Sequence, residues 1–140
     1  MNQRALLGAA LYFAALTTAT AADLTITVDG ARNVNGALAL ALFSSESSFP
    51  RAPLAIASAR MRARQEATFT FHDLAPGMYA VSAYHDENDN GKLDADAVGF
   101  PTEGLGFSND ARITTGPPAF AKAAFELRDE KKKVSVKVLY

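Results

Sequence analysis

Residues 74–85 read Leu-Ala-Pro-Gly-Met-Tyr-Ala-Val-Ser-Ala-Tyr-His. The ring of Pro76 fixes its φ at about −65°, and Gly77 can adopt a positive φ, so this pair predicts a tight turn. Tyr79 then stands at the start of the next strand. That placement is typical of a tyrosine corner, in which the hydroxyl bonds back to the upstream backbone. The alternative is an aromatic residue on a strand without a corner.

Alternating apolar residues surround this turn on both sides. Period-two alternation places one set of side chains on a buried face and is typical of half-buried strands. Residues 54–64 are compatible with a short helix, but Arg60, Arg62 and Arg64 recur at period two and favour a strand with these arginines on its exposed face. The predicted strands cover residues 24–28, 37–43, 56–64, 67–71, 79–85, 123–127 and 134–138.

About seven short strands without a convincing long helix predict an all-β fold. We expect an antiparallel β-sandwich of the transthyretin-like or immunoglobulin-like kind, formed by one domain over residues 23–140. Residues 131–133 are three lysines between the last two predicted strands. A phosphate-binding or membrane-binding role is conceivable for them, but such runs are usually solvated hairpin loops or protected sheet edges.

Composition excludes several classes of function. The 140 residues include no cysteine and two histidines, and the formal net charge is −1. Without cysteine there is no disulfide scaffold, thiolate zinc site or cysteine nucleophile. Without a basic excess there is no electrostatic reason to expect nucleic acid as a partner.

Residues 1–22 predict a secretory signal peptide. Arg4 precedes an apolar stretch over residues 5–16, and small residues follow with an Ala-x-Ala site at Ala19 and Ala21. A membrane anchor is the alternative, but this stretch is shorter than the about 20 apolar residues that a helix needs to span a bilayer. We expect cleavage after Ala21 or Ala22, a periplasmic or secreted chain, and no transmembrane segment after cleavage.

Residues 86–97 are spaced like a calcium-binding loop. Side-chain oxygens alternate from position one, Gly91 permits the sharp reversal at position six, and the position-seven ligand is a backbone carbonyl. The expected ligands are Asp86, Asn88, Asn90, the Lys92 carbonyl and Asp94, with Asp96 as a sixth.

The match to the calcium pattern is incomplete. Ala97 occupies position twelve, where a bidentate glutamate belongs, so Asp96 or Glu103 would have to substitute. Any calcium affinity is then expected to be weak, at about 10⁻⁴ to 10⁻³ M. The alternative is a long turn whose Asn and Asp side chains bond their own backbone.

Residues 99–109 form a second candidate region for ligand binding. The candidate residues are Phe100, Glu103, Phe107 and Asn109, in a loop rich in glycine and with two aromatics expected to be exposed. A small-molecule-binding protein would have a pocket under Phe100, Glu103 and Phe107. The same loop could instead fold back and cap one end of the core.

Catalysis is not expected. His85 lies beside Asp86 and Glu87, but a lone histidine at a strand end is more often a packing or hydrogen-bonding residue. No serine stands in a nucleophile elbow, and His72 has only Asp73 beside it. We therefore expect a non-enzymatic module.

The chain resembles a bacterial family known as domain of unknown function 2141. The resemblance rests on the motifs at residues 85–94, 99–109, 116–120 and 123–125. It implies a small exported β-sandwich with no established activity to carry over. Separately, we expect a partner that is an unknown protein or a component of the cell envelope. A shorter likeness over residues 74–96 connects the chain with adhesin sandwiches that hold calcium. Transthyretin-like hydrolases are the enzymatic alternative, but residues 137–140, Lys-Val-Leu-Tyr, lack their terminal motif.

Overall fold

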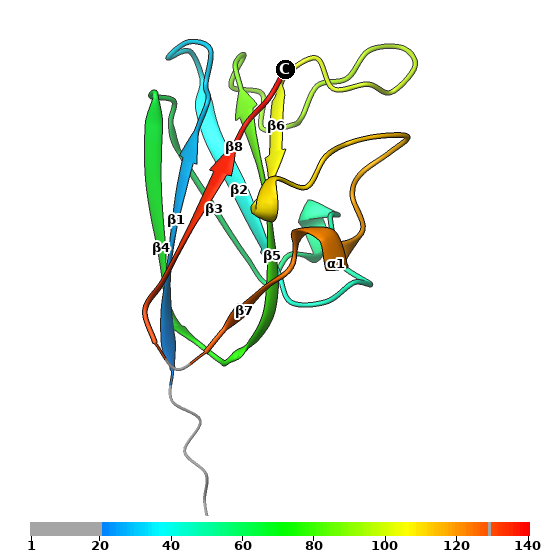
Figure 1. The fold of residues 1–140 in the computed structure, drawn as a ribbon. Helices are drawn as coiled ribbons and strands as arrows, with labels where there is room; N and C mark the ends of the chain where they lie inside the picture. Colours follow the sequence, from blue (N-terminus) through cyan, green and yellow to red (C-terminus); the bar gives the residue numbers. More distant parts are fainter. Residues whose placement is uncertain (1–20, 129) are drawn as a thin grey trace, which may run out of the picture.

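The computed structural model describes residues 21–128 and 130–140, and this part of the chain forms eight strands with three short helical segments (Figure 1). The strands are β1 (Ala22–Asp29), β2 (Ala37–Phe43), β3 (Ala57–Arg62), β4 (Glu66–Leu74), β5 (Gly77–Asp86), β6 (Gly104–Phe107), β7 (Phe125–Leu127) and β8 (Lys132–Lys137). The helical segments are η1 (Ala52–Leu54), η2 (Ser108–Asp110) and α1 (Phe120–Ala123).

The strands form two packed sheets, which confirms the predicted β-sandwich. One sheet has the order β4-β1-β8, and the other has the order β3-β2-β5-β6 with β7 also paired to β5. The transthyretin-like or immunoglobulin-like subtype stays a prediction.

The sandwich is not wholly antiparallel, which corrects the prediction. β8 runs parallel to β1, with Leu24 opposite Lys132 and Asp29 opposite Lys137. The reason is that β7 and β8 do not form a hairpin, because β7 pairs with β5 in one sheet while β8 lies at the edge of the other. The lysine run therefore lies where the chain passes between sheets and enters an edge strand, where lysine discourages pairing with another chain.

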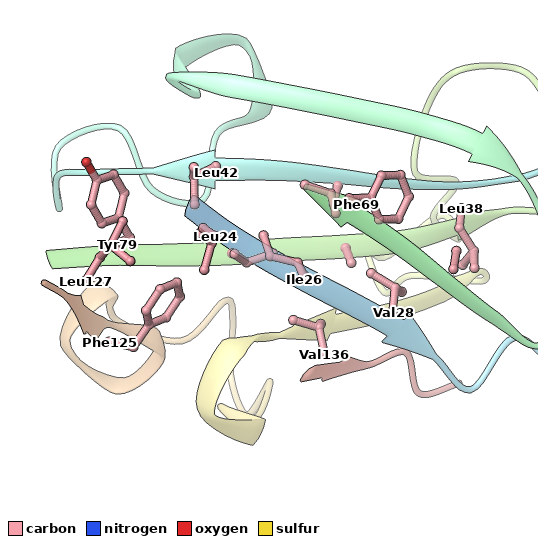
Figure 2. Packing of buried hydrophobic residues seen from close by; sticks show 14 of the residues in the cluster. Leu24, Ile26, Val28, Leu38, Leu42, Phe69, Tyr79, Phe125, Leu127 and Val136 are labelled. Atoms are coloured by element: carbon pink, nitrogen blue, oxygen red, sulfur yellow. The ribbon is translucent and has the colours of Figure 1, made fainter. Parts of the chain in front are cut away.

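The main core lies between the sheets and follows the period-two pattern (Figure 2). Leu24, Ile26 and Val28 of β1 are fully buried. From the other sheet, β2 contributes Leu38 and Leu42 to the same core. Each such side chain contributes about 1.5–3 kcal/mol on burial, so alternating apolar residues on strands from both sheets hold them together.

The turn before β5 is a tyrosine corner, as predicted. The Tyr79 hydroxyl donates a 2.6 Å hydrogen bond to the Ala75 carbonyl oxygen. Tyr79 is buried, and this burial raises its pKa.

A second, smaller core covers part of the outer face of the five-stranded sheet. Phe49, from the segment after β2, packs edge-on against Phe43 and Phe107 at centroid distances of 5.3 and 5.8 Å. All seven residues of β2 are consequently buried. Phe107 is 4% exposed. It is therefore not the exposed aromatic that the sequence predicted, because the outer face of β6 lies under Phe49.

The predicted signal peptide falls almost wholly outside the described residues. β1 begins at Ala22, which is buried and pairs with Leu74, one residue before the predicted domain boundary. Among the residues that the structure describes, no helix is long and apolar enough to cross a membrane.

Candidate functional site

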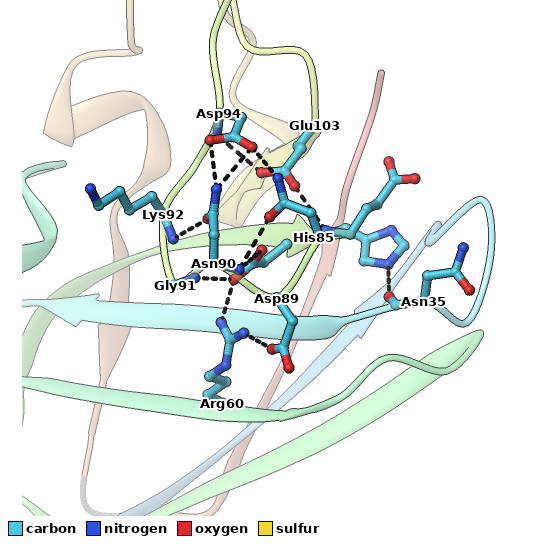
Figure 3. A network of polar contacts seen from close by, with 12 residues as sticks. Asn35, Arg60, His85, Asp89, Asn90, Gly91, Lys92, Asp94 and Glu103 are labelled. Carbon is cyan, nitrogen blue, oxygen red and sulfur yellow. Dashed lines mark hydrogen bonds and ion pairs between the residues drawn. The ribbon is translucent and has the colours of Figure 1, made fainter.

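The loop after β5 is folded around the Asp86 carboxylate. Figure 3 shows Arg60, Asn90 and Asp94 in the polar network of this loop. Asp86 Oδ1 accepts the Asn90 amide at 3.0 Å, and Oδ2 accepts the Gly91 amide at 2.7 Å. Gly91 has φ +79°, which L side chains rarely adopt. The predicted reversal at Gly91 is thus present, and it wraps the chain around a buried carboxylate.

Arg60 supplies the positive charge at this carboxylate. Its Nη1 lies 2.7 Å from Asp86 Oδ2, and its Nη2 contacts the exposed Asp89 carboxylate. The Asp86 side chain is 0% exposed and that of Arg60 is 35% exposed. Burial raises the pKa of Asp86, but the hydrogen bonds from Arg60, Gly91 and Asn90 outweigh it, so the net pKa lies below its ordinary value.

The other predicted calcium ligands also lie in this loop, bonded to one another. Asn88 Nδ2 donates to Asp94 Oδ2 at 2.6 Å, and Asn90 Nδ2 donates to both Asp94 oxygens at 2.9 and 3.0 Å. Asn90 Oδ1 accepts the Lys92 amide at 2.9 Å. The structure therefore brings these side chains together as a hydrogen-bonded turn.

Asp96 lies apart from this cluster. Its Oδ1 accepts the Val98 amide at 3.0 Å and the Phe100 amide at 2.9 Å. Over residues 21–128 and 130–140, no group of three or more His, Asp or Glu side chains is arranged to hold a metal ion. A calcium ion would have to compete with Arg60 for Asp86, so the geometry fits calcium only in part and the calcium site stays a prediction.

Glu103 joins the two ends of the loop. Its Oε1 accepts the Glu87 amide at 2.8 Å and its Oε2 accepts the Asp94 amide at 3.0 Å. The side chain belongs to a residue only 6% exposed. Glu103 is therefore a structural clamp whose oxygens are both occupied, and it faces the loop as well as the neighbouring pocket.

The clamped loop carries a short arm, residues 94–102, that presents Phe100. The Asp96 amide donates to the Phe100 carbonyl at 2.8 Å, and the Thr102 amide donates to the Asp94 carbonyl at 2.9 Å. Phe100 nevertheless remains 60% exposed. An aromatic ring held on an ordered backbone in solvent is typical of a binding surface.

His85 fixes Tyr140 beside this loop. The buried imidazole places Nε2 2.8 Å from the Asn35 carbonyl oxygen and Nδ1 2.6 Å from the Tyr140 hydroxyl. A carbonyl can only accept, so Nε2 donates to Asn35, and Nδ1 pairs with the tyrosine hydroxyl. Arg32 stacks on the Tyr140 ring at 4.4 Å. Both nitrogens of His85 thus serve to position Tyr140.

A pocket of about 280 Å³ lies between the arm, β6 and residues 137–140; we name it the end pocket. It is bordered by Phe100, Pro101, Glu103, Leu105, Gly106, Phe107, Asp110, Ala111, Arg112, Ile113, Lys137, Leu139 and Tyr140. The glycines of β6 allow this arrangement, because a Cβ on Gly104 would lie 2.7 Å from Tyr140 Cζ and one on Gly106 would lie 2.1 Å from the Lys137 carbonyl oxygen.

Three of the four predicted ligand-binding residues, Phe100, Glu103 and Phe107, line the end pocket. Asn109 does not, because its Nδ2 donates to the Ala124 carbonyl at 2.5 Å.

Other residues of the end pocket were not predicted from the sequence. Arg112, Ile113, Lys137, Leu139 and Tyr140 line it and were not predicted. Side chains alternate between the two faces of an extended segment, so Lys137 and Leu139 lie on the face opposite buried Val138. This alternation is the sequence signal that could have identified these two residues as exposed.

The fold and this site define a β-sandwich with a loop-built pocket at one end of its five-stranded sheet. The family model described as "Uncharacterized protein conserved in bacteria (DUF2141)" matches residues 26–135. The chain therefore belongs to this bacterial family, as the motifs suggested. Comparisons with curated proteins and with solved structures found no match.

Proposed function

We propose that the chain is an exported, non-enzymatic binding module that holds a small amphipathic molecule in the end pocket. One observation carries this proposal: four large apolar side chains that remain exposed, Phe100, Ile113, Leu139 and Tyr140, border the same pocket. Clustered exposed apolar groups around a concavity are typical of ligand sites, whereas isolated ones are ordinary.

The pocket is preorganised by the polar network beneath it. Glu103 clamps the loop, Asp96 holds the backbone of Phe100, and His85 holds Tyr140. Since these groups are fixed before a ligand arrives, binding costs less conformational entropy.

The charges around the end pocket favour a ligand with one carboxylate. Arg112 and Lys137 are exposed and make no ion pair among the described residues. Asp110 is the exposed acid at the rim, while Glu103 is bonded to backbone amides. The four charged side chains that border the pocket balance, but the Glu103 carboxylate is buried and faces two backbone amides, so the exposed rim presents two cations and one carboxylate. An aromatic or compact aliphatic carboxylate would place its apolar group against Phe100 and its charge at the rim.

The absence of catalysis is part of the proposal. No serine, cysteine or histidine borders the end pocket. His72 is exposed and lies in β4 of the three-stranded sheet, where its Nδ1 is 3.0 Å from Asp23 Oδ1. It does not border the end pocket.

Thermal melts with matched ligand pairs test the binding proposal. Phenylacetate should raise Tm, because a ligand that binds only the folded state stabilises it by about 1.4 kcal/mol at ten times its Kd. Phenethylamine, with the same ring and the opposite charge, should give a smaller rise.

Two variants locate the effect of phenylacetate. Phe100→Ala and Arg112→Glu should each abolish the rise, while Lys131→Glu, with the same charge change outside the pocket, should keep it. If none of the small carboxylates tested changes the Tm of the wild-type chain, the proposal is overturned.

Export is proposed from the sequence, and the fold supports cleavage after Ala21 rather than Ala22. Ala22 is buried and pairs with Leu74, so a cut after Ala22 would remove the first residue of β1. Mass spectrometry of the chain from a periplasmic extract tests this. A mature chain that begins at Ala22 is expected, and an uncut chain in the cytoplasm would contradict export.

Calcium binding by the loop is the second candidate role. The convergence of Asn88 and Asn90 on the Asp94 carboxylate favours it, because three oxygen-bearing side chains gather in one place. To turn their amide oxygens toward a metal ion, the two asparagines would give up the bonds they accept from the Asn90 and Lys92 amides. The guanidinium of Arg60 at Asp86 opposes it. The two roles are compatible, since calcium would brace the same loop that carries Phe100.

A further inference from the structure

The outer face of the five-stranded sheet holds a second and larger pocket, of about 760 Å³, which we name the sheet-face pocket. Its floor is made by small residues that share one face of adjacent strands. Ala41 of β2 lies opposite Ser58 of β3 and Ser82 of β5, and Ala39 continues the same row. Tyr84 and Leu105 complete the floor toward β6.

Small floor residues explain why space remains here. Elsewhere on the same face, Phe43, Phe49 and Phe107 fill the layer above the sheet. Ala41 lies at the border of that aromatic cluster, whereas Ala39, further along β2, is not part of it. The segment with Pro50 and Pro53, the loop with Leu93, and Pro117 stand around this part of the sheet as walls.

The lining of the sheet-face pocket is apolar apart from its serines, the Tyr84 hydroxyl and two cations. The two cations differ in availability. Arg60 is neutralised by Asp86 and Asp89. Lys92 is exposed and makes no ion pair among the described residues. One uncompensated positive charge therefore stands at the wall of an apolar pocket.

We propose that the sheet-face pocket binds the hydrocarbon chain of a long-chain carboxylate, with its carboxylate at Lys92. The volume lies within the about 300–1,000 Å³ of small-molecule sites. Each methylene buried from water contributes about 0.8 kcal/mol, so a flexible chain gains affinity without needing polar partners.

A bound polypeptide fits this place less well than a hydrocarbon chain. The backbone amides of β2 and β5 are paired within the sheet, so the floor offers no ladder of donors and acceptors to an extended peptide. A peptide backbone laid on Ala39 and Ala41 would lose its water without replacement hydrogen bonds, which is costly. An acyl chain has no such groups. This inference does not depend on the end pocket, although Leu105 and Phe107 border both.

Isothermal titration with dodecanoate, kept below its micelle concentration, tests the proposal. The wild-type chain should bind one dodecanoate saturably and bind dodecyltrimethylammonium, with the same chain and a cationic head, at least threefold more weakly. Lys92→Glu should weaken dodecanoate binding at least threefold and reverse this preference. Lys131→Glu, an equal charge change away from the pocket, should bind as the wild type does.

Two further variants separate the two pockets. Ser58→Trp would fill the sheet-face pocket from an exposed position on edge strand β3, where an aromatic side chain is well tolerated, and should weaken dodecanoate at least tenfold. Phe100→Ala should leave dodecanoate binding unchanged. Absence of saturable binding by the wild type would overturn the proposal, and so would binding that depends on Phe100 but not on Ser58 or Lys92. If Ser58→Trp does not fold, the Lys92→Glu comparison decides alone.

Discussion

Replacement of Glu103 is the sharpest test of the clamped loop. Glu103→Ala leaves the amides of Glu87 and Asp94 without their acceptors. A fully buried donor left unsatisfied costs about 1–3 kcal/mol, and because these two bonds are only partly buried the combined loss is about 2–3 kcal/mol. Glu103→Gln keeps one acceptor oxygen but presents an NH₂ group in place of the other, so about half of that loss is expected. For a domain of this size each kcal/mol lowers Tm by about 4 °C.

The assay combines thermal melts with amide hydrogen exchange. The melts should rank wild type above Glu103→Gln, and Glu103→Gln above Glu103→Ala. Exchange should accelerate at the amides of Glu87 and Asp94 more than in β1. Glu66→Gln, the same change at an exposed residue, is the control. A Glu103→Ala chain with wild-type Tm and wild-type protection at both amides would refute the clamp.

Three other predictions concern the same framework. The pKa of Asp86 is depressed in the folded state, so its contribution to stability is present above its unfolded pKa and is lost as the pH falls through the folded pKa. In urea melts, the free energy of unfolding should therefore fall more from about pH 5 to about pH 3 in wild type than in Asp86→Asn. Tyr79→Phe removes the bond to the Ala75 carbonyl and should lower the free energy of unfolding in urea melts by about 0.5–1.5 kcal/mol, whereas an unchanged value would show that the corner contributes packing alone. Millimolar calcium tests the second candidate role: a calcium-selective rise over the Tm measured in EDTA that is lost in Asp94→Ala would establish the metal site, whereas an unchanged Tm would leave Arg60 as the partner of Asp86 and rule that role out.

Local pattern was enough to predict most of the strands. The alternation around Ile26 and Leu40 reflects the geometry of a strand with one face in the core, and it survives in the structure. The Pro-Gly-x-Tyr turn predicted the corner because its requirements, a fixed φ and a nearby carbonyl, are local. The convergence of Asn88, Asn90 and Asp94 in one loop was likewise readable from their spacing.

Contacts between distant segments could not be read from the sequence. Arg60 looked like an ordinary exposed residue of a strand, and its pairing with Asp86 follows from the register of β3, β2 and β5. Phe107 looked exposed because nothing local shows that Phe49 covers it. Tyr140 entered the site only because His85, 55 residues earlier, holds its hydroxyl. Each of these depends on tertiary placement, which periodicity does not encode.

The binding role of the end pocket is the central claim, and nuclear magnetic resonance tests it most directly. Titration of the ¹⁵N-labelled chain with phenylacetate should shift amide resonances in the segments 100–113 and 137–140, which contain the residues that line the pocket. Amides of the β4-β1 pair, on the other sheet, should stay unmoved. Saturable shifts confined to the pocket segments are the predicted result. Shifts scattered over the surface, or none up to saturating concentrations, would contradict the assignment of this pocket as the binding site.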